Sequence, residues 1–177
     1  YISNLWFMPS TPVLSNAGTE RGLPISCFLN EASDSLTGIV DLWSENVWLA
    51  AKGGGIGSYW GNLRSIGEQV GRVGKTSGIM PFIKVMDSLT LAISQGSLRR
   101  GSAACYLPID HPEIEEFIEM RRPTGGDPNR RALNLHHGVL VTDAFMRAVE
   151  LDEQWPLKSP YDATVQSKIS ARNLWIR

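Results

Sequence analysis

Residues 34–57 read DSLTGIVDLWSENVWLAAKGGGIG, and this stretch carries the clearest structural signal in the chain. Asp34 and Ser35 are residue types that cap a helix, because their side-chain oxygens accept hydrogen bonds from free backbone N–H groups. Apolar residues then recur at intervals of three and four, the spacing of one helical face, at Leu36, Ile39, Val40, Trp43, Val47 and Ala50. The glycines after Lys52 end the pattern. The sequence therefore predicts a helix over 36–52 that leads into a strand.

The same alternation continues along the chain. Strands are expected over 56–63, 103–107 and 133–141, and helices over 79–93, 112–122 and 142–150. The segments 64–78 and 97–101 are expected to be loops. Thr142 is expected to cap the helix that runs to about Glu150, and Ser170 is expected to cap one more helix. Strands that are apolar on both faces and alternate with helices are typical of a parallel α/β sheet or barrel.

The composition is that of an ordinary globular protein. The chain has 177 residues, 42% of them hydrophobic, which suffices for one sizeable core. Seventeen basic and eighteen acidic residues give a net charge of −1, so no overall basic surface indicates a nucleic-acid or anionic-membrane partner. No apolar run approaches the roughly 20 residues that cross a bilayer, and the first residues lack the basic segment of a signal peptide. We expect a cytoplasmic protein.

Neither end carries the signals of a domain boundary. The chain begins at Tyr1 without a Met, and the helix expected after Ser170 meets no stop signal before Arg177. We therefore expect residues 1–177 to form part of a larger domain that is incomplete at both ends.

Cys27 is the residue best suited to chemistry. Turn-forming residues precede it, and Ser26 and Cys27 open an apolar stretch, so the thiol is expected at a strand edge that faces a pocket or the core. On residue type alone, a cysteine between Ile25 and Phe28 is more often a small buried hydrophobe than a reactive thiol. Cys27 and Cys105 form neither a metal-binding spacing nor a disulfide framework, so both are expected to be free thiols.

Two glycine-rich segments suggest phosphate binding without matching a known motif. Residues 71–76 read GRVGKT, but a P-loop requires a glycine where Gln69 stands. Residues 53–57 read GGGIG and lead from a helix into a strand, the reverse of the order in the dinucleotide fingerprint. Two interpretations stay open for the first segment, a polyphosphate site or a solvated basic loop. The basic residues of the loop 64–78, which contains this segment, are Arg64, Arg72 and Lys75.

The histidines and acidic residues indicate neither a metal site nor acid–base catalysis. His136 and His137 are adjacent, so on a strand they point to opposite faces and do not readily chelate one ion. His111 precedes Pro112 at a junction between a strand and a helix, where a cap or turn residue is expected. The acids of the helix 112–122 are expected to be solvated; they are Glu113, Glu115, Glu116 and Glu119.

Several blocks, taken in order, resemble the large, catalytic subunit of ribonucleotide reductase. They are PSTPVLSNAGT (9–19), SCFL (26–29), DSL (34–36), GGGIG (53–57), NLR (62–64), SQGSLRRGSA (94–103), YLPIDHPEIEEF (106–117) and NLHHG (134–138). Each block is weak alone, but the colinear set is specific and covers nearly the whole chain. The family fold is an α/β barrel of ten strands in two antiparallel halves of five parallel strands. The resemblance implies that this chain forms most of the first half.

The resemblance also implies a radical reduction of ribonucleotides to deoxyribonucleotides. In the family, a cysteine thiyl radical abstracts the 3′ hydrogen of the substrate, and two other cysteines reduce the 2′ carbon while they form a disulfide. Cys27 matches the first of this reducing pair, and its partner would lie outside the chain. Thr11, Ser26 and Gly55 match positions that hold the substrate nucleotide. Cys105 matches no catalytic position and is expected in the core.

A second set of residues matches the allosteric site of the family, which binds dNTP or ATP effectors. The residues that match it are Asp34, Ser35, Leu36, Arg64 and Arg72. Gln95 and Arg99 match the loop that relays the identity of the effector to the substrate base. Because Arg100 stands beside Arg99, it is open which of the two faces the substrate.

The resemblance further implies partners. The helices 36–52 and 79–93 would pack across a homodimer, and a thioredoxin- or glutaredoxin-type dithiol would reset the cysteines. The radical would come from a small subunit with a metal–radical centre or from adenosylcobalamin, and no cofactor or metal is expected on this chain. Both diphosphate and triphosphate substrates stay open. Because the radical cysteine would lie outside the chain, we expect residues 1–177 alone to be inactive. The alternative is a noncatalytic nucleotide-binding or dimerisation module, which would not need Cys27 as a redox thiol.

Overall fold

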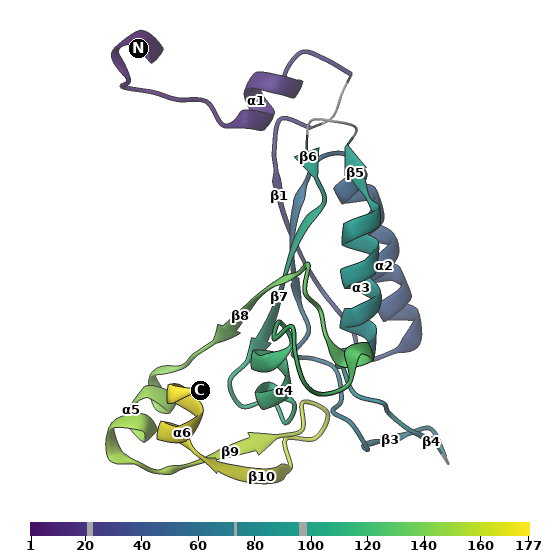
Figure 1. Cartoon of the computed structure of the whole chain (residues 1–177), viewed down its shortest axis with the longest axis vertical. Coiled ribbons are helices and arrows are strands. Elements are labelled where there is room, and N and C mark those ends of the chain that lie inside the picture. Colours follow the sequence, from purple (N-terminus) through teal and green to yellow (C-terminus); the bar gives the residue numbers. More distant parts are fainter. Residues whose placement is uncertain (21–22, 73, 96–98) are drawn as a thin grey trace.

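A four-stranded parallel sheet organises the protein in a computed structural model that describes residues 1–20, 23–72, 74–95 and 99–177. The strands lie in the order β1 (Cys27–Glu31), β2 (Gly55–Tyr59), β7 (Ser102–Pro108) and β8 (His136–Leu140). Helices α2 (Leu36–Ala51), α3 (Met80–Ala92) and α4 (Ile114–Glu119) lie between successive strands along the chain (Figure 1). The α/β class with parallel strands is therefore confirmed.

The two faces of this sheet differ. One face bears buried side chains such as Ile56, Ser58 and Cys105, and α2 and α3 pack side by side against it (Figure 1). Cα partners in parallel strands share a face, so the register places Cys27 with Gly55 and Tyr106 with Gly138 on the other face. That second face is rich in small residues and is here called the open face.

Helix α2 begins and ends as its sequence predicts. The Ser35 hydroxyl accepts a hydrogen bond from the Gly38 N–H at 3.0 Å, which caps the first turn. The side chains buried against the sheet are Ile39, Leu42, Asn46 and Ala50. The predicted apolar face was therefore only partly right, because Leu36 and Val40 point outward and are exposed.

Helix α3 differs more from its predicted face. The apolar spacing within 79–93 predicts a buried face made of Phe82, Val85, Met86, Leu89, Ala92 and Ile93. The buried residues are instead Met80, Ile83, Met86 and Asp87, so only Met86 is common to both sets. Asp87 is buried because its carboxylate accepts hydrogen bonds from the backbone N–H groups of Asn134 and Leu135, at 2.7 and 3.1 Å. A carboxylate that is hydrogen-bonded in this way can lie in a core. The apolar spacing alone therefore predicted the wrong face of α3 as the buried one.

A second packing unit lies beyond the carboxyl ends of the strands (Figure 1). It consists of α5 (Asp143–Leu151), the antiparallel hairpin of β9 (Gln154–Lys158) and β10 (Val165–Ser170), and α6 (Ala171–Ile176). Phe145, Trp155 and Trp175 form edge and tilted ring contacts there. Thr142 and Ser170 cap α5 and α6 as predicted, whereas the hairpin was not predicted.

Three short regions complete the chain. The N-terminal arm holds a 3₁₀ turn (Ile2–Asn4) and α1 (Thr11–Asn16), and it projects from the amino end of the sheet (Figure 1). The segment predicted as one loop over 64–78 contains a small hairpin of β3 (Gln69–Val70) and β4 (Gly74–Lys75). A second hairpin pairs β5 (Ser94–Gln95) with β6 (Arg99–Arg100), and a 3₁₀ turn spans Pro128–Arg130. Among the described helices, none is long and apolar enough to cross a membrane.

Candidate nucleotide-binding sites

Cys27 lies at the amino end of the sheet, on the open face. It pairs with Gly55 across β1 and β2, and the Gly55 N–H donates a hydrogen bond of 2.6 Å to the Ser26 carbonyl. The Ser26 hydroxyl lies 3.7 Å from the Cys27 sulfur. The thiol is exposed, so it is neither packed in the core nor bonded to the buried Cys105. Three of the residues matched to substrate binding thus lie together.

Thr11, the fourth of these residues, is exposed on α1. Figure 1 places α1 near the amino end of β1, the same end of the sheet as Cys27. Gln95 and Arg99 pair with each other across the β5–β6 hairpin, although their side chains lie outside what the structure describes. The hairpin also lies at this end of the sheet (Figure 1).

A cavity of about 320 Å³ lies at the opposite, carboxyl end of β1. Its wall combines the start of α2, the middle of the β2–β3 connection and the segment 74–78 before α3. Among its lining residues are Asp34, Ser35, Leu36, Arg64, Lys75 and Ser77. Four of the five residues matched to the effector site therefore line one cavity.

An ion pair between Asp34 and Arg64 lies in the wall of this cavity. The Arg64 Nε lies 2.6 Å from Asp34 Oδ2, and both side chains are mostly buried. Arg64 also donates to the Gln69 carbonyl at 2.7 Å. The ring centroid of Tyr161, from the turn between β9 and β10, lies 4.8 Å from the Arg64 guanidinium carbon. Three groups thus fix the guanidinium in place, and Tyr161 is a contact that the sequence did not indicate.

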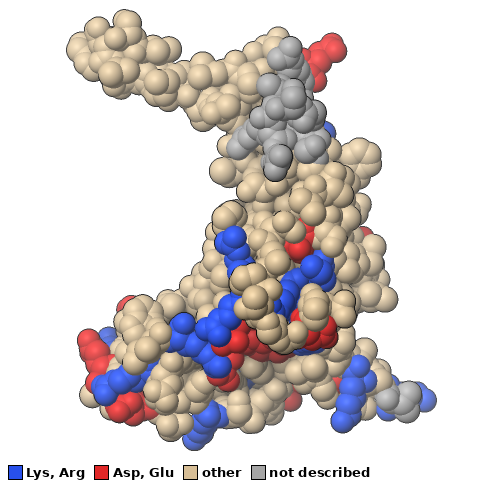
Figure 2. Space-filling view, in the orientation of Figure 1, with Lys and Arg blue, Asp and Glu red and all other residues tan. Residues whose placement is uncertain are grey.

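Arg72, the fifth matched residue, is exposed beside the β3–β4 hairpin and does not line the cavity. Lys75 lines it instead. On the face in Figure 2, charged side chains gather over the lower half of the molecule, around α4 and the β3–β4 hairpin. The basic character expected of the 64–78 segment is therefore divided between the cavity wall, at Arg64 and Lys75, and an exposed hairpin, at Arg72.

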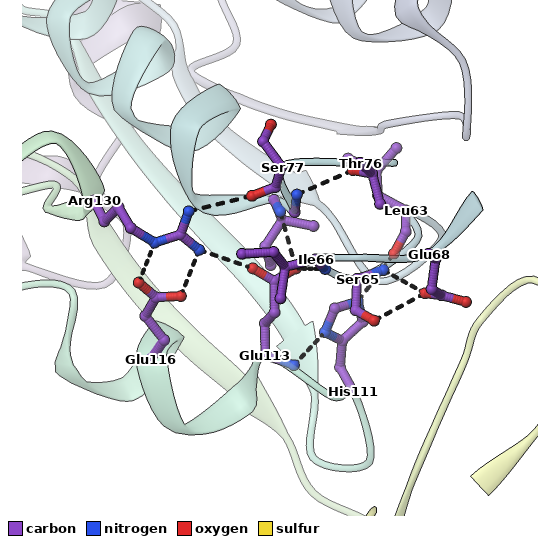
Figure 3. A network of polar contacts seen from close by, with 12 residues as sticks. Leu63, Ser65, Ile66, Glu68, Thr76, Ser77, His111, Glu113, Glu116 and Arg130 are labelled. Carbon is purple, nitrogen blue, oxygen red and sulfur yellow. Dashed lines mark hydrogen bonds and ion pairs between the residues drawn. The ribbon is translucent and has the colours of Figure 1, made fainter. Parts of the chain in front are cut away.

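Glu113 corrects an expectation from the sequence. It was expected to be solvated, yet it is 5% exposed and lies inside a polar network (Figure 3). Its Oε2 accepts hydrogen bonds from the N–H groups of Ile66 (3.1 Å) and Ile79 (3.0 Å), and Arg130 donates to its Oε1 at 3.3 Å. Burial raises the pKa of Glu113 to about 7, although these contacts favour the charged carboxylate.

Two further titratable groups, His111 and Cys105, have structural contacts. His111 is buried, and its ring joins the Leu63 carbonyl (2.9 Å) to the Glu113 N–H (3.1 Å), so it is a turn residue that also ties two loops. Cys105 lies in the core, where burial raises the pKa of its thiol, and its sulfur is 3.9 Å from that of Met86. Within the described ranges, no three His, Cys, Asp or Glu residues gather as metal ligands.

The family model of the ribonucleotide reductase barrel domain matches residues 25–173. The chain belongs to this family. A ribonucleotide reductase barrel explains the parallel sheet with one helix-covered face and one open face. The Ser26, Cys27 and Gly55 group and the residues that line the Asp34–Arg64 cavity fall inside the matched residues, whereas Thr11 precedes them.

Similar proteins agree with this membership. The chain is 46% identical over 177 residues to a Frog virus 3 (isolate Goorha) protein that bears the name of a ribonucleoside-diphosphate reductase large subunit. It is 40% identical over 184 aligned residues to the ribonucleoside-diphosphate reductase large subunit of Invertebrate iridescent virus 6. It is 35% identical over 162 residues to the ribonucleoside-diphosphate reductase subunit alpha of Chlamydia muridarum (strain MoPn / Nigg). The whole of this chain aligns with the two viral proteins, and 91% of it aligns with the Chlamydia protein. The chain nevertheless covers only 30%, 18% and 15% of the length of these relatives.

Proposed function

We propose that the intact protein is a ribonucleoside-diphosphate reductase large subunit in which Cys27 is one of two reducing thiols. The supporting observation is the exposed Cys27 thiol opposite Gly55, on the face of the sheet that α2 and α3 do not cover. Family membership and the names of the relatives support the same reaction. A thiol buried against α2 and α3, as Cys105 is, could not reach a substrate.

The chemistry of Cys27 balances as a two-electron reduction. Two thiols give up two electrons and two protons and become a disulfide, while the 2′ hydroxyl leaves the ribonucleotide as water. A cysteine thiyl radical elsewhere in the intact protein, generated by the radical source in trans, removes the 3′ hydrogen at the start and returns it at the end, and the 2′ carbon takes up a hydrogen in place of the lost hydroxyl. Ser26 lies within reach of the thiol, and the exposed start of β1 leaves the sulfur accessible to an external dithiol of the thioredoxin or glutaredoxin type.

The Asp34–Arg64 cavity is the proposed effector site. A triphosphate would meet the Arg64 guanidinium and Lys75, and Asp34 and Ser35 offer oxygens to a sugar hydroxyl or base. Helix α2 begins at this cavity and ends at the glycines beside Cys27. Its 16 residues span about 24 Å. One rigid element thus joins the proposed effector and substrate sites.

The proposed homodimer rests on the outward faces of α2 and α3. Large apolar side chains are exposed there, including Leu36, Val40, Trp48, Val85 and Leu91. Exposed apolar groups of this kind on neighbouring helices are typical of a protein interface. Replacing Trp48 with Asp should convert a dimer to a monomer in sedimentation velocity, and an unchanged dimer would place the interface elsewhere.

The reductase proposal is tested by Cys27→Ser in the intact protein with its radical source and a dithiol reductant. Ribonucleotide turnover should fall to background, because serine cannot form the disulfide. Nucleotide binding at the Asp34–Arg64 cavity should persist, and Cys105→Ala should stay active. Full turnover by Cys27→Ser would instead favour the noncatalytic module.

A further inference from the structure

We propose that Glu113, supported by Arg130, is a positioning residue of the effector cavity. Its carboxylate binds both ends of the segment 66–79, which forms part of the cavity wall. This inference rests on the proposed effector site. It concerns how the wall of that site is held, and Glu113 is not among the residues that line the cavity.

One carboxylate oxygen holds both ends of the segment. Glu113 Oε2 accepts from the N–H of Ile66 at its start and from the N–H of Ile79 at its end, at 3.1 and 3.0 Å (Figure 3). The cavity-lining residues 74–78 lie between these two points. Breaking both hydrogen bonds would therefore remove one anchor of the wall at each end of the segment.

Arg130 holds the same segment from its other side. Its guanidinium donates to the Ser77 carbonyl at 3.2 Å, and Ser77 lines the cavity. It also forms two hydrogen bonds with the Glu116 carboxylate, at 2.5 and 2.7 Å, besides the contact with Glu113. Arg130, on the 3₁₀ turn, thus links Glu116 of α4 to Ser77 in the cavity wall (Figure 3).

Gly78 shows how closely the wall and the carboxylate fit. Gly78 has φ +81°, and a Cβ on it would overlap the Glu113 carboxylate oxygens. The Gly78 N–H is satisfied by the Thr76 hydroxyl at 3.0 Å, so the backbone can approach the carboxylate edge without another acceptor.

The chemistry of the contact suggests a discriminating pair of variants. In Glu113→Gln, the amide oxygen can take the place of Oε2 and accept both N–H groups, whereas the amide nitrogen faces Arg130. In Glu113→Ala, both N–H groups lose their acceptor. Glu115→Ala is the matched control, because Glu115 lies on the same helix, is 43% exposed and pairs with Arg177, away from the cavity.

The test measures dTTP binding to the intact protein by calorimetry, with hydrogen exchange of the amides in segment 66–79. Loss of two buried hydrogen bonds to a charged group should weaken dTTP binding about tenfold or more in Glu113→Ala. Glu113→Gln should restore affinity to within about threefold, and Glu115→Ala should match the wild type. The Ile66 and Ile79 amides should exchange faster in Glu113→Ala only.

The outcomes separate the two proposals. If the wild type does not bind dTTP, the effector site is wrong, and exchange at Ile66 and Ile79 still tests the positioning role. If Glu113→Ala binds dTTP as tightly as the wild type while those amides exchange faster, the positioning proposal fails. It also fails if Glu113→Gln loses as much affinity as Glu113→Ala, because a general loss of packing would do the same.

Discussion

Cys27 lies directly opposite Gly55 in the parallel pairing of β1 and β2, at the end of the sheet farthest from Asp34 and Arg64. The five residues of β1 span about 13 Å between their first and last Cα atoms. Because Cys27 and Gly55 share the open face, the thiol is accessible without any movement of α2 or α3. The two cysteines of the chain therefore occupy opposite environments.

Thiol reactivity follows from this difference. Cys27 is exposed, whereas Cys105 is buried and burial raises the pKa of its thiol, so little thiolate forms there. A chromogenic disulfide reagent at pH 8 should modify Cys27 rapidly and Cys105 only after unfolding in urea. Mass spectrometry of tryptic peptides identifies the modified site. Equal labelling of both cysteines in the folded protein would contradict the placement of Cys105.

Gly54 is predicted to be intolerant of any side chain. A Cβ there would lie 2.6 Å from two ring carbons of Phe28 and 3.0 Å from the Leu49 carbonyl oxygen. Gly54→Ala should lower the free energy of unfolding by about 1–3 kcal/mol, since the crowded ring and backbone must shift. Gly55→Ala is the graded control, because its Cβ would meet only the Ser26 carbonyl, at 3.3 Å, and its loss should be smaller.

A double variant checks the cause of that loss. Phe28→Leu makes room for the methyl group, so Gly54→Ala with Phe28→Leu should lose less stability than the sum of the two single losses. Urea unfolding measures all three variants. Additive losses would show that the Phe28 ring is not the obstacle.

Local sequence signals predicted the sheet and α2 well. Ser35, the apolar spacing and the glycines after Lys52 all act within a few residues of one another, so one sequence is enough to recognise them. The same was true of the caps at Thr142 and Ser170. By contrast, periodicity did not single out Cys27, Gly55 or the effector residues. The resemblance to the family did.

The failures involve partners far apart in sequence. Glu113 follows the pattern of a solvated acid in a first helical turn, and only the folded chain brings Ile66, Ile79 and Arg130 to it. The buried face of α3 was predicted wrongly for the same reason. Asp87 is buried there because it accepts hydrogen bonds from N–H groups at 134–135, far along the chain. Buried carboxylates that bind backbone N–H groups leave no local spacing by which a sequence could reveal them.

Tyr161 is expected to contribute to the energetics of the Arg64 cluster. Its ring stacks near the Arg64 guanidinium, but the side chain is 69% exposed, so the contribution should be modest. A double-mutant cycle of Arg64→Ala and Tyr161→Ala in urea unfolding should give a coupling energy of about 0.5–1 kcal/mol. Tyr161→Phe keeps the ring and should retain the coupling. A coupling of zero would show that the two side chains are neighbours without an interaction.

The pH dependence of stability should report the burial of Glu113. Its pKa in the folded protein is raised to about 7 from an ordinary 4.5, so the folded protein binds this proton more tightly than the unfolded chain does. The stabilisation from this proton is fully present below about pH 4.5 and is lost as the pH rises through about 7.

The matched comparison is Glu113→Gln, whose side chain does not titrate at this position. This variant has every other titrating group in common with the wild type, including Glu68, His111 and Glu116. The free energy of unfolding of the wild type, minus that of Glu113→Gln, should rise as the pH falls from 8 to 5. Its steepest slope approaches about 1.4 kcal/mol per pH unit between the two pKa values. If the ion pair with Arg130 outweighed desolvation, the folded pKa would lie below 4.5 instead. The difference would then be flat from pH 8 to 5 and would fall only under more acidic conditions, so the direction of the curve identifies which effect is larger.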